Sequence, residues 1–433
     1  MNRIIITIFF ILFQLHAGAQ TLLKLQDVFE IALQNNFSIR IAKNDAEATK
    51  NNNSSGNAGM LPFATGTVNQ DNQVTDTKQK FLSGAENNRT GAKASNFNAN
   101  VELGWTIFNG MKMFVSKEKL SELEAIGNLR LRQQVELVLT RVAKSYYDVV
   151  LNKQQLKSSK EFIGISEKRL KVAEAKVLSG KSAKSEVLLA QVNLNSDKAA
   201  YMRLQTQYKN SKLNLNQLMA KEFTFDYEVE DSIIPNEQIK LEEIRSKAFD
   251  KNTGLQISKL NQHINLLQLK EIRSERMPTL QLKTGYNFSK QTSQAGFLQS
   301  SNNTGFHYGA GLSINLFNGF DVSRRINNAQ LQWSSGEMLY KDSLSKLEMA
   351  ITQAYNNYVT NIELLHFEQS NLAVAEQNFS IARDQHEQGM ISSNDLRIAQ
   401  VNLLQNINRL LVAAYDARLS EVELDRLSGG LVR

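Results

Sequence analysis

Histidine and cysteine patterns are where metal or nucleophile chemistry would be expected, and this sequence offers little of either. It has no cysteine, which excludes disulfides, thiolate metal sites and cysteine nucleophiles. A zinc-binding helix requires two histidines three or four residues apart. No pair has that spacing among the five present, which are His16, His263, His307, His366 and His386.

Two glycine motifs resemble fragments of nucleotide-binding loops. Gly180-Lys181-Ser182 has the end of a phosphate-binding loop, but Ala175 stands where the first glycine is required. Gly309-Ala310-Gly311 lacks the third glycine of a dinucleotide-binding motif, because Ile314 occupies that position. We therefore expect that the protein is not an enzyme and holds no cofactor and no resident metal. Its function has to be inferred from its predicted helices and strands.

Composition favours long helices over a loop-rich globule. The 433 residues include only 3 prolines and 22 glycines, and 42% are hydrophobic. The mean hydropathy of -0.35 does not suit a helical membrane protein. The net charge of +7 is mild, and the basic residues form no block of the kind found in nucleic-acid binders. We expect no nucleic-acid partner.

The N-terminus has the layout of a secretory signal peptide, which we place at 1–19. Arg3 precedes an apolar run over 4–13, and the small residues 17–19 follow it. The run is too short to span a bilayer. The alternative is a short anchoring helix. We expect the protein to be exported.

The rest of the chain is an internal sequence duplication. Pro62 recurs as Pro278, 216 positions later, and Phe108-Asn109-Gly110 recurs as Phe317-Asn318-Gly319, 209 positions later. Further pairs at the second spacing are Tyr146 and Tyr355, Glu167 and Glu376, Gly180 and Gly389, and Gln191 and Gln400. The change of spacing indicates an insertion of about seven residues in the first copy, which we expect in a loop.

This duplication defines the domain organisation. It predicts a first structural repeat over 20–219 and a second over 241–433. The segment 220–240 between them is the predicted linker.

Each repeat contains a predicted β-hairpin, at about 62–107 and 279–316. Apolar and polar residues alternate over about ten residues, which marks a strand with one face of each kind. The length and the aromatic residues fit strands that cross an outer membrane. The alternative is a soluble hairpin that packs its apolar face on a core. The polar stretches 72–95 and 291–304 predict long surface loops.

A long helical hairpin is predicted after each β-hairpin. Apolar residues step by three or four along 112–178 and 321–387 without a proline, as in a coiled coil. Gly180 and Gly389 interrupt the two patterns at equivalent positions, so the tips are expected near these residues. An arm of this length measures about 100 Å, which suits a spacer or a wall.

Four strands cannot close a barrel, and an open sheet edge is not tolerated in lipid. Strands that cross a membrane would therefore have to come from several subunits that share one barrel. A dimer would supply eight strands and a trimer twelve. Eight strands leave an interior filled by side chains, whereas a larger barrel can enclose an aqueous channel.

The duplicated order of helix, strand hairpin, long helix, glycine turn and returning helix resembles the TolC family of outer-membrane efflux proteins, over about residues 20–429. The matching residues are Leu25-Gln26-Asp27-Val28, Ala32-Leu33, Asn35-Asn36, Leu61-Pro62, Met277-Pro278, the two Phe-Asn-Gly segments, and Gly389 with Asp395-Leu396 and Ala399-Gln400.

The resemblance implies a membrane α+β fold with two internal structural repeats. Four strands per chain, twelve in a homotrimer, would form an outer-membrane β-barrel continuous with a long periplasmic α-helical coiled-coil barrel. The linker 220–240 would lie in an equatorial belt around that tunnel.

The resemblance also implies the exit duct of a tripartite efflux or type I secretion system. Small molecules or proteins would leave passively through it. An inner-membrane pump would drive export through a periplasmic adaptor (membrane fusion) protein.

The same resemblance implies roles for the glycine turns. The helical-hairpin tips, where an adaptor would make contact, are Gly180, Lys181 and Ser182 in one repeat and Gly389, Met390 and Ile391 in the other. Asp395 matches one acid of the family's periplasmic entrance constriction. Ile398 and Ile391 stand where a second acid and a gating arginine are expected, so charge-gated closure is only partly encoded. The alternative for Asp395 is an acid that favours a helix start.

Two other classes of protein remain as alternatives. A trimeric surface adhesin also contributes four strands per subunit to a shared barrel, but its strands lie at the C-terminus, whereas here they are interior and duplicated. A periplasmic coiled-coil structural protein would explain the helical hairpins and leave the strands without a purpose.

Overall fold

A computed structural model describes residues 22–296 and 298–431 of the chain. The predicted signal peptide at 1–19 lies outside these residues. The described chain forms two compact units, a helical unit and a sheet unit. The helical unit comprises 22–44, 130–256 and 343–431, and the sheet unit comprises 45–129 and 257–342 except residue 297.

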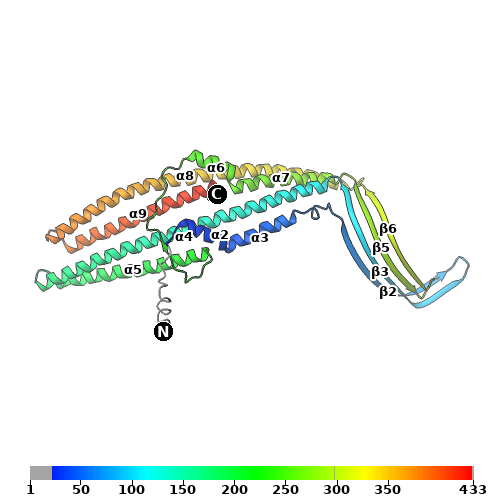
Figure 1. Ribbon diagram of the computed structural model, residues 1–433, viewed down its shortest axis with the longest axis horizontal. Helices are drawn as coiled ribbons and strands as arrows, with labels where there is room; N and C mark the ends of the chain where they lie inside the picture. Colours follow the sequence, from blue (N-terminus) through cyan, green and yellow to red (C-terminus); the bar gives the residue numbers. More distant parts are fainter. Residues whose placement is uncertain (1–21, 297, 432–433) are drawn as a thin grey trace, which may run out of the picture. The chain divides into compact units, whose positions relative to one another are not determined.

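The sheet unit is built around one antiparallel sheet of four strands in the order β2-β3-β5-β6 (Figure 1). Their bounds are β2 Phe63–Lys80, β3 Glu86–Asn109, β5 Thr279–Ser293 and β6 Ser300–Ser313. Each repeat contributes one hairpin, and the hairpins meet where β3 pairs with β5. In the described part of the chain, β2 and β6 are edges with no further strand beside them.

The prediction of surface loops at 72–95 and 291–304 is wrong, because most of both stretches is β-strand. Pairing of β2 with β3 continues beyond the four-stranded sheet as a two-stranded ribbon over 74–93. Polar residues cover both faces of this ribbon, so the alternation that identifies a strand is lost while its backbone hydrogen bonds persist. The extra residues of the first copy extend this ribbon. In the second copy β6 ends at Ser313, so 314–316 lie outside it.

Four helices form two helical hairpins (Figure 1). They are α4 Lys112–Leu178 with α5 Lys184–Leu218, and α8 Asp321–Glu387 with α9 Ser393–Leu427. The two first arms have 67 residues each and the two returning arms 35 each. All three prolines, at 62, 235 and 278, lie outside these helices, which therefore run without a break. No helix in the described chain is both long enough and apolar enough to cross a membrane.

The core of the helical unit lies where short elements pack on the helical hairpins. These elements are β1 Leu22–Leu23, α2 Leu25–Asn35, β4 Glu228–Val229 and α6 Leu241–Lys251. Strand β4, in the predicted linker 220–240, pairs in parallel with β1. Tyr146 is fully buried there, and its hydroxyl donates to the Leu23 carbonyl at 3.1 Å. Burial raises the pKa of this tyrosine, which therefore stays neutral.

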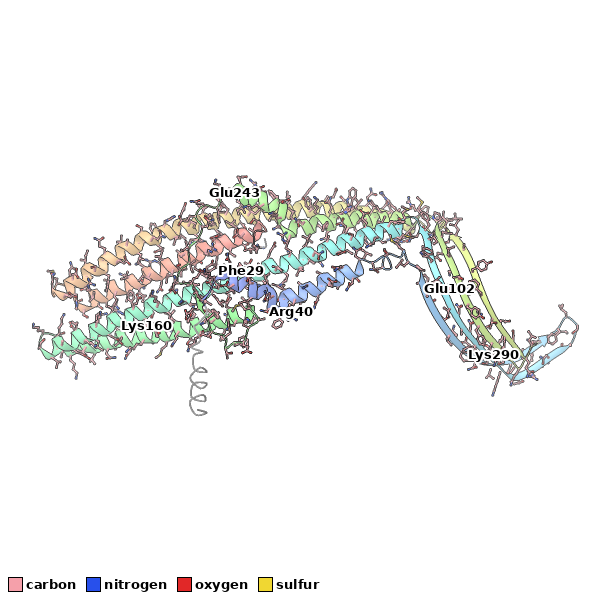
Figure 2. The ribbon with its side chains drawn as sticks, viewed as in Figure 1. Phe29, Arg40, Glu102, Lys160, Glu243 and Lys290 are labelled. Atoms are coloured by element: carbon pink, nitrogen blue, oxygen red, sulfur yellow. The ribbon has the colours of Figure 1, made fainter. Side chains whose placement is uncertain are left out.

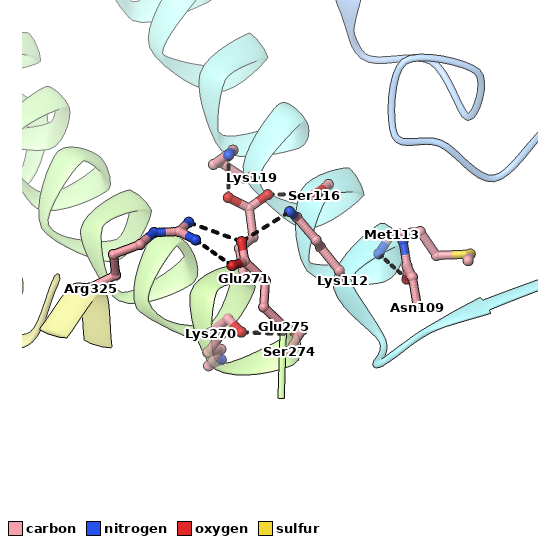
Figure 3. Close-up of polar contacts among 10 residues, drawn as sticks. All are labelled: Asn109, Lys112, Met113, Ser116, Lys119, Lys270, Glu271, Ser274, Glu275 and Arg325. Carbon is pink, nitrogen blue, oxygen red and sulfur yellow. Dashed lines mark hydrogen bonds and ion pairs between the residues drawn. The ribbon is translucent and has the colours of Figure 1, made fainter. Parts of the chain in front are cut away.

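The remaining helices are α3 Phe37–Asn52 and α7 Thr253–Ser274. In the sheet unit, a polar cluster joins α4 and α8 to the end of α7 and the residue that follows it (Figure 3). Arg325 donates to both carboxylate oxygens of Glu275, at 2.5 and 3.0 Å, and Lys112 Nζ lies 3.4 Å from the same group. Lys119 pairs with Glu271 one turn away. These contacts fix the position of α7, which precedes β5 in the chain, and of α4, which follows β3.

Candidate functional site: the helical tips and the two-faced sheet

The two helical hairpins turn at tips with the same backbone structure. The N–H groups of Gly180 and Lys181 donate to carbonyls in the last turn of α4, at 3.0 and 2.8 Å. Gly389 and Met390 make the equivalent bonds to α8, at 3.0 and 2.9 Å. These paired bonds need a left-handed residue, and φ is +70° at Gly180 and +78° at Gly389. Glycine takes that conformation without strain.

The returning helices begin with different caps. In α9 the Ser392 hydroxyl accepts from the Asp395 N–H at 3.2 Å, and the Ser392 N–H donates to the Asp395 carboxylate at 3.1 Å. Hydrogen bonds from Ser392 hold the pKa of the exposed Asp395 carboxyl below its usual value. In α5 the Ser182 hydroxyl donates to Glu186 at 2.6 Å, and Ala183 provides no side-chain cap.

The side chains at the second tip divide between solvent and a small core. Met390 is 69% exposed, and Ile398, one turn into α9, is 52% exposed. Ile391 is half-buried and packs on an apolar cluster formed by Ala382, Leu396 and Ala399. The residue at the expected position of a gating arginine therefore serves as packing under its own tip.

A buried polar network, here called the tip network, links the first helical hairpin to α9. Arg397 donates to both oxygens of Asp197, at 2.6 and 2.8 Å. Arg169 donates to the side-chain carbonyl of Gln400 at 3.0 Å. Gln400 is fully buried and donates to the Ser166 hydroxyl at 3.1 Å. Because α4, α5 and α9 all contribute, the network joins the two hairpins just below their tips.

Asp197 pairs with Arg397 and also lies near Arg169 in the tip network. Burial lowers the pKa of Arg169, the nearby positive charge of Arg397 lowers it further, and Asp197 opposes both effects. The Arg169 Nε lacks a hydrogen-bond partner among the described residues. Removal of Asp197 would leave Arg397 without its ion-pair partner, and breaking a buried ion pair in this way costs about 3 kcal/mol.

Sequence reasoning missed the charged members of this network, although the repeat held a signal. Gln400 was aligned with Gln191 between the copies, but the network's charged residues change at equivalent positions. At the spacing of 209, Arg169 and Asp197 of the first copy align with Asn378 and Asn406 of the second. Arg397 of the second copy aligns with Leu188 of the first. Charged residues present in only one copy therefore indicate positions where the two helical hairpins have different roles.

A hollow of about 370 Å³ lies beside the network, between α4, α8 and α9. Its apolar wall includes Val172 and Phe379, and its rim includes Lys176 and His386. Burial lowers the pKa of His386, and the positive charges of Lys176 and Arg169 lower it further. The imidazole is therefore neutral at pH 7.

The sheet has one apolar and one polar face, because directly paired residues share a side. Val101, Tyr286 and Phe306 form a single apolar row across three strands, and each side chain is more than half exposed. Glu102 and His307 lie in the next row, on the opposite face. A fold whose sheet exposes an apolar face needs another surface, lipid or protein, to cover it.

The profile of the outer membrane efflux protein family matches residues 28–221 and 245–430. The chain belongs to the outer membrane efflux protein family. The family resemblance inferred from the sequence is thereby confirmed. As a member of the family, the protein resides in the outer membrane, extends into the periplasm and forms the exit duct of a tripartite efflux system.

Solved structures of outer-membrane proteins share the fold. The CmeC channel of Campylobacter jejuni is 16% identical with a TM-score of 0.77, over 94% of this chain and 85% of that chain. VceC of Vibrio cholerae is 15% identical with a TM-score of 0.74, over 94% and 96%. The open MtrE channel of Neisseria gonorrhoeae is 14% identical with a TM-score of 0.72, over 94% and 89%. Among curated proteins, no sequence matches this chain.

These relatives are channels rather than enzymes. Within 22–296 and 298–431, no three histidine, aspartate or glutamate side chains lie close enough together to hold a metal ion.

Proposed function

We propose that three copies of this chain assemble into one outer-membrane duct. The observation that carries the proposal is a sheet with two unpaired edges and one exposed apolar face. Edge N–H and C=O groups left unpaired in lipid each cost several kcal/mol, so a spanning sheet has to close. Strand β6 of one copy would pair with β2 of the next. Three copies of four strands give a closed barrel of twelve, wide enough for a water-filled lumen.

The height of the apolar face supports this assignment. Apolar rows run from Leu280 to Phe288 along β5 and continue across β3 and β6. The eight steps between these nine residues span about 27 Å along a strand, and about 20 Å across a membrane at a tilt of 40°. Aromatic side chains mark both limits, with Trp105 near the helical end and Phe97 near the far end. Such girdles are typical of outer-membrane barrels.

The helices also support an assembly of copies. Phe367, Val374 and Ile381 recur every seven residues on α8 and are 64%, 66% and 48% exposed. A seam with this repeat packs against another helix in a coiled coil. A neighbouring copy would cover the seam and would continue the barrel as a helical tunnel.

The duct would conduct passively, with export driven by an inner-membrane pump through a periplasmic adaptor. The tips are the ends of the two helical hairpins, and they present Gly180, Lys181, Gly389 and Met390 to solvent, while Ser182 is half-buried. We assign adaptor contact to these residues together with the half-buried Ile391. The exposed Asp395 carboxylate would set the charge of the periplasmic entrance, and the linker 220–240 would form part of an equatorial belt.

Single-channel conductance in a planar lipid bilayer, combined with the native mass of the detergent-extracted protein, tests this proposal. We expect a mass of three chains and steady conducting events. A trimer that is silent in its native form but conducts when Asp197→Asn loosens the tips would also support the duct, because the tunnel would then be closed at rest. Monomers, or trimers silent in both forms, would contradict the duct.

A further inference from the structure

The register of the sheet places every side chain of its apolar face in a defined row. The last apolar row contains Val68, Ala99 and Phe288. The next row on the same face contains Gln70, Phe97, Lys290 and Asn302. Phe97 is the final aromatic residue, and its ring contacts Phe288 edge to face at 5.9 Å. Lys290, directly opposite Phe97, is the first charged side chain beyond the apolar band (Figure 2).

A polar hollow opens one row further out. It has a volume of about 540 Å³, and its lining includes all four members of that row, which are Asn72, Ser95, Thr292 and Ser300. The Gln70 amide donates to the Asn72 carbonyl at 3.0 Å and to the Ser95 hydroxyl at 2.7 Å. These bonds place the polar groups of the two rows on one face. Lys93, one row beyond, also lines the hollow.

Lys93 and Lys290 differ from Lys80 and Lys283 in their charge environment. Lys283, on the opposite face, lies 3.8 Å from the Glu102 carboxylate, and Lys80, further out on the ribbon, lies 3.3 Å from Glu86. Within the described residues, neither Lys93 nor Lys290 has a carboxylate at ion-pair distance, and both are exposed. Lys93 lines the hollow and Lys290 lies in the row before it, so two positive charges without an acidic partner flank its row of hydroxyl and amide groups.

We propose that this hollow binds the phosphorylated sugar headgroup of a glycolipid in the outer leaflet. The inference rests on the proposed function, which places the end of the sheet away from the helices outside the cell. The depth fits, because Lys290 lies in the same row as Phe97, the last aromatic side chain of this face, where acyl chains give way to headgroups. The chemistry fits as well. The ammonium groups of Lys93 and Lys290 would hold phosphate, and the hydroxyl and amide side chains would hydrogen-bond the sugar.

The test uses full-length trimers extracted from the outer membrane and stripped of bound lipid. Binding of purified phosphorylated glycolipid is measured for the native protein and for the double variant Lys93→Gln/Lys290→Gln. A cationic residue near a membrane surface changes affinity for anionic lipid about fivefold. We therefore expect the double variant, which lacks both lysines, to bind the glycolipid about 25-fold more weakly. The matched control is Lys80→Gln/Lys283→Gln, which removes two sheet lysines that have acidic partners and should bind like the native protein.

Further arms separate the sources of phosphate. The dephosphorylated glycolipid should bind the native protein as weakly as the intact lipid binds the double variant. Vesicles of phosphatidylglycerol and free inorganic phosphate should compete poorly, since neither offers the sugar. Equal binding by all variants, or full competition by either of these anions, would overturn the proposal.

Conductance and native mass of the same preparations keep this result apart from the proposed function. Conducting trimers that bind glycolipid equally with and without the two lysines would refute the headgroup site and leave the duct intact. A failure of the native chain to form trimers would refute the duct itself.

Discussion

Asp395 shows how one carboxylate can serve both structure and conduction. Its Oδ2 accepts from both the Ser392 N–H and the Ser392 hydroxyl, at 3.1 and 2.7 Å, which closes the first turn of α9. Those bonds hold its pKa below the usual value, so the group is charged at neutral pH. The side chain is nevertheless exposed, and its charge is available to ions that pass the entrance.

We expect Asp395→Asn to weaken cation preference and block by divalent cations, because the trimer loses three charges while the amide oxygen can still accept from Ser392. Reversal potentials under a salt gradient measure the effect. Glu186→Gln is the matched control, since Glu186 occupies the equivalent place after the first tip and accepts from Ser182. Unchanged selectivity in Asp395→Asn would remove this carboxylate from the conduction path.

At the level of elements, the two helical hairpins are held together near their tips by contacts that depend on charge. His386 faces Lys176 and Arg169 from α4 and Glu186 from α5, and Glu387 adjoins it on its own helix. Its pKa in the folded protein lies below the ordinary histidine value. Protonation is therefore easier in the unfolded chain than in the folded one.

Stability of this region should fall as the pH drops below about 6.5, because the unfolded state then binds a proton that the folded state resists. Amide hydrogen exchange in the last turns of α4 and α8 at pH 7.5 and pH 5.5 measures the effect. His386→Gln should make exchange less sensitive to pH. His366→Gln, a half-exposed histidine on the same helix, should leave the dependence unchanged. A native-like dependence in His386→Gln would assign the effect to other groups.

The elements differ in how much their sequence reveals. The helical arms could be predicted because proline is absent over 67 residues and glycine stands at both turns. The β-strands were recognised only where one face is apolar, along 97–107 for example. The ribbon over 74–93 was missed, because a ribbon polar on both faces has no alternation to detect. The tip network was missed because Arg169, Asp197 and Arg397 meet only through tertiary packing.

At the scale of the whole molecule, this chain exposes surfaces that a single copy leaves uncovered. The seam of Phe367, Val374 and Ile381 on α8 is one, and the apolar face of the sheet is another. Sequence alone predicted that strands of this kind, if they cross a membrane, must come from several subunits that share a barrel, since four strands cannot close one. The number of copies came from the family resemblance, because repeat patterns within one chain do not count subunits.

We expect Val374→Glu to shift the native mass from three chains towards one. The change removes the burial of valine at the seam, worth about 1.5 kcal/mol per copy, and places a charge in an apolar contact. Gln369→Glu is the control, because it adds the same charge at an exposed position of α8 outside the seven-residue repeat. A trimer that persists in Val374→Glu would mean that this seam faces something other than a sister chain.

The equal arm lengths constrain how such a chain can change in size over evolution. The first arms match at 67 residues and the returning arms at 35, whereas the strands of the two repeats measure 18 and 24 against 15 and 14. Deletion of seven residues from each arm of one helical hairpin would shorten that hairpin by about 10 Å relative to the hairpin of the other repeat. Insertions and deletions in the helices are therefore tolerable only in matched pairs. The outer ribbon carries no such constraint, so length variation between related proteins should accumulate there.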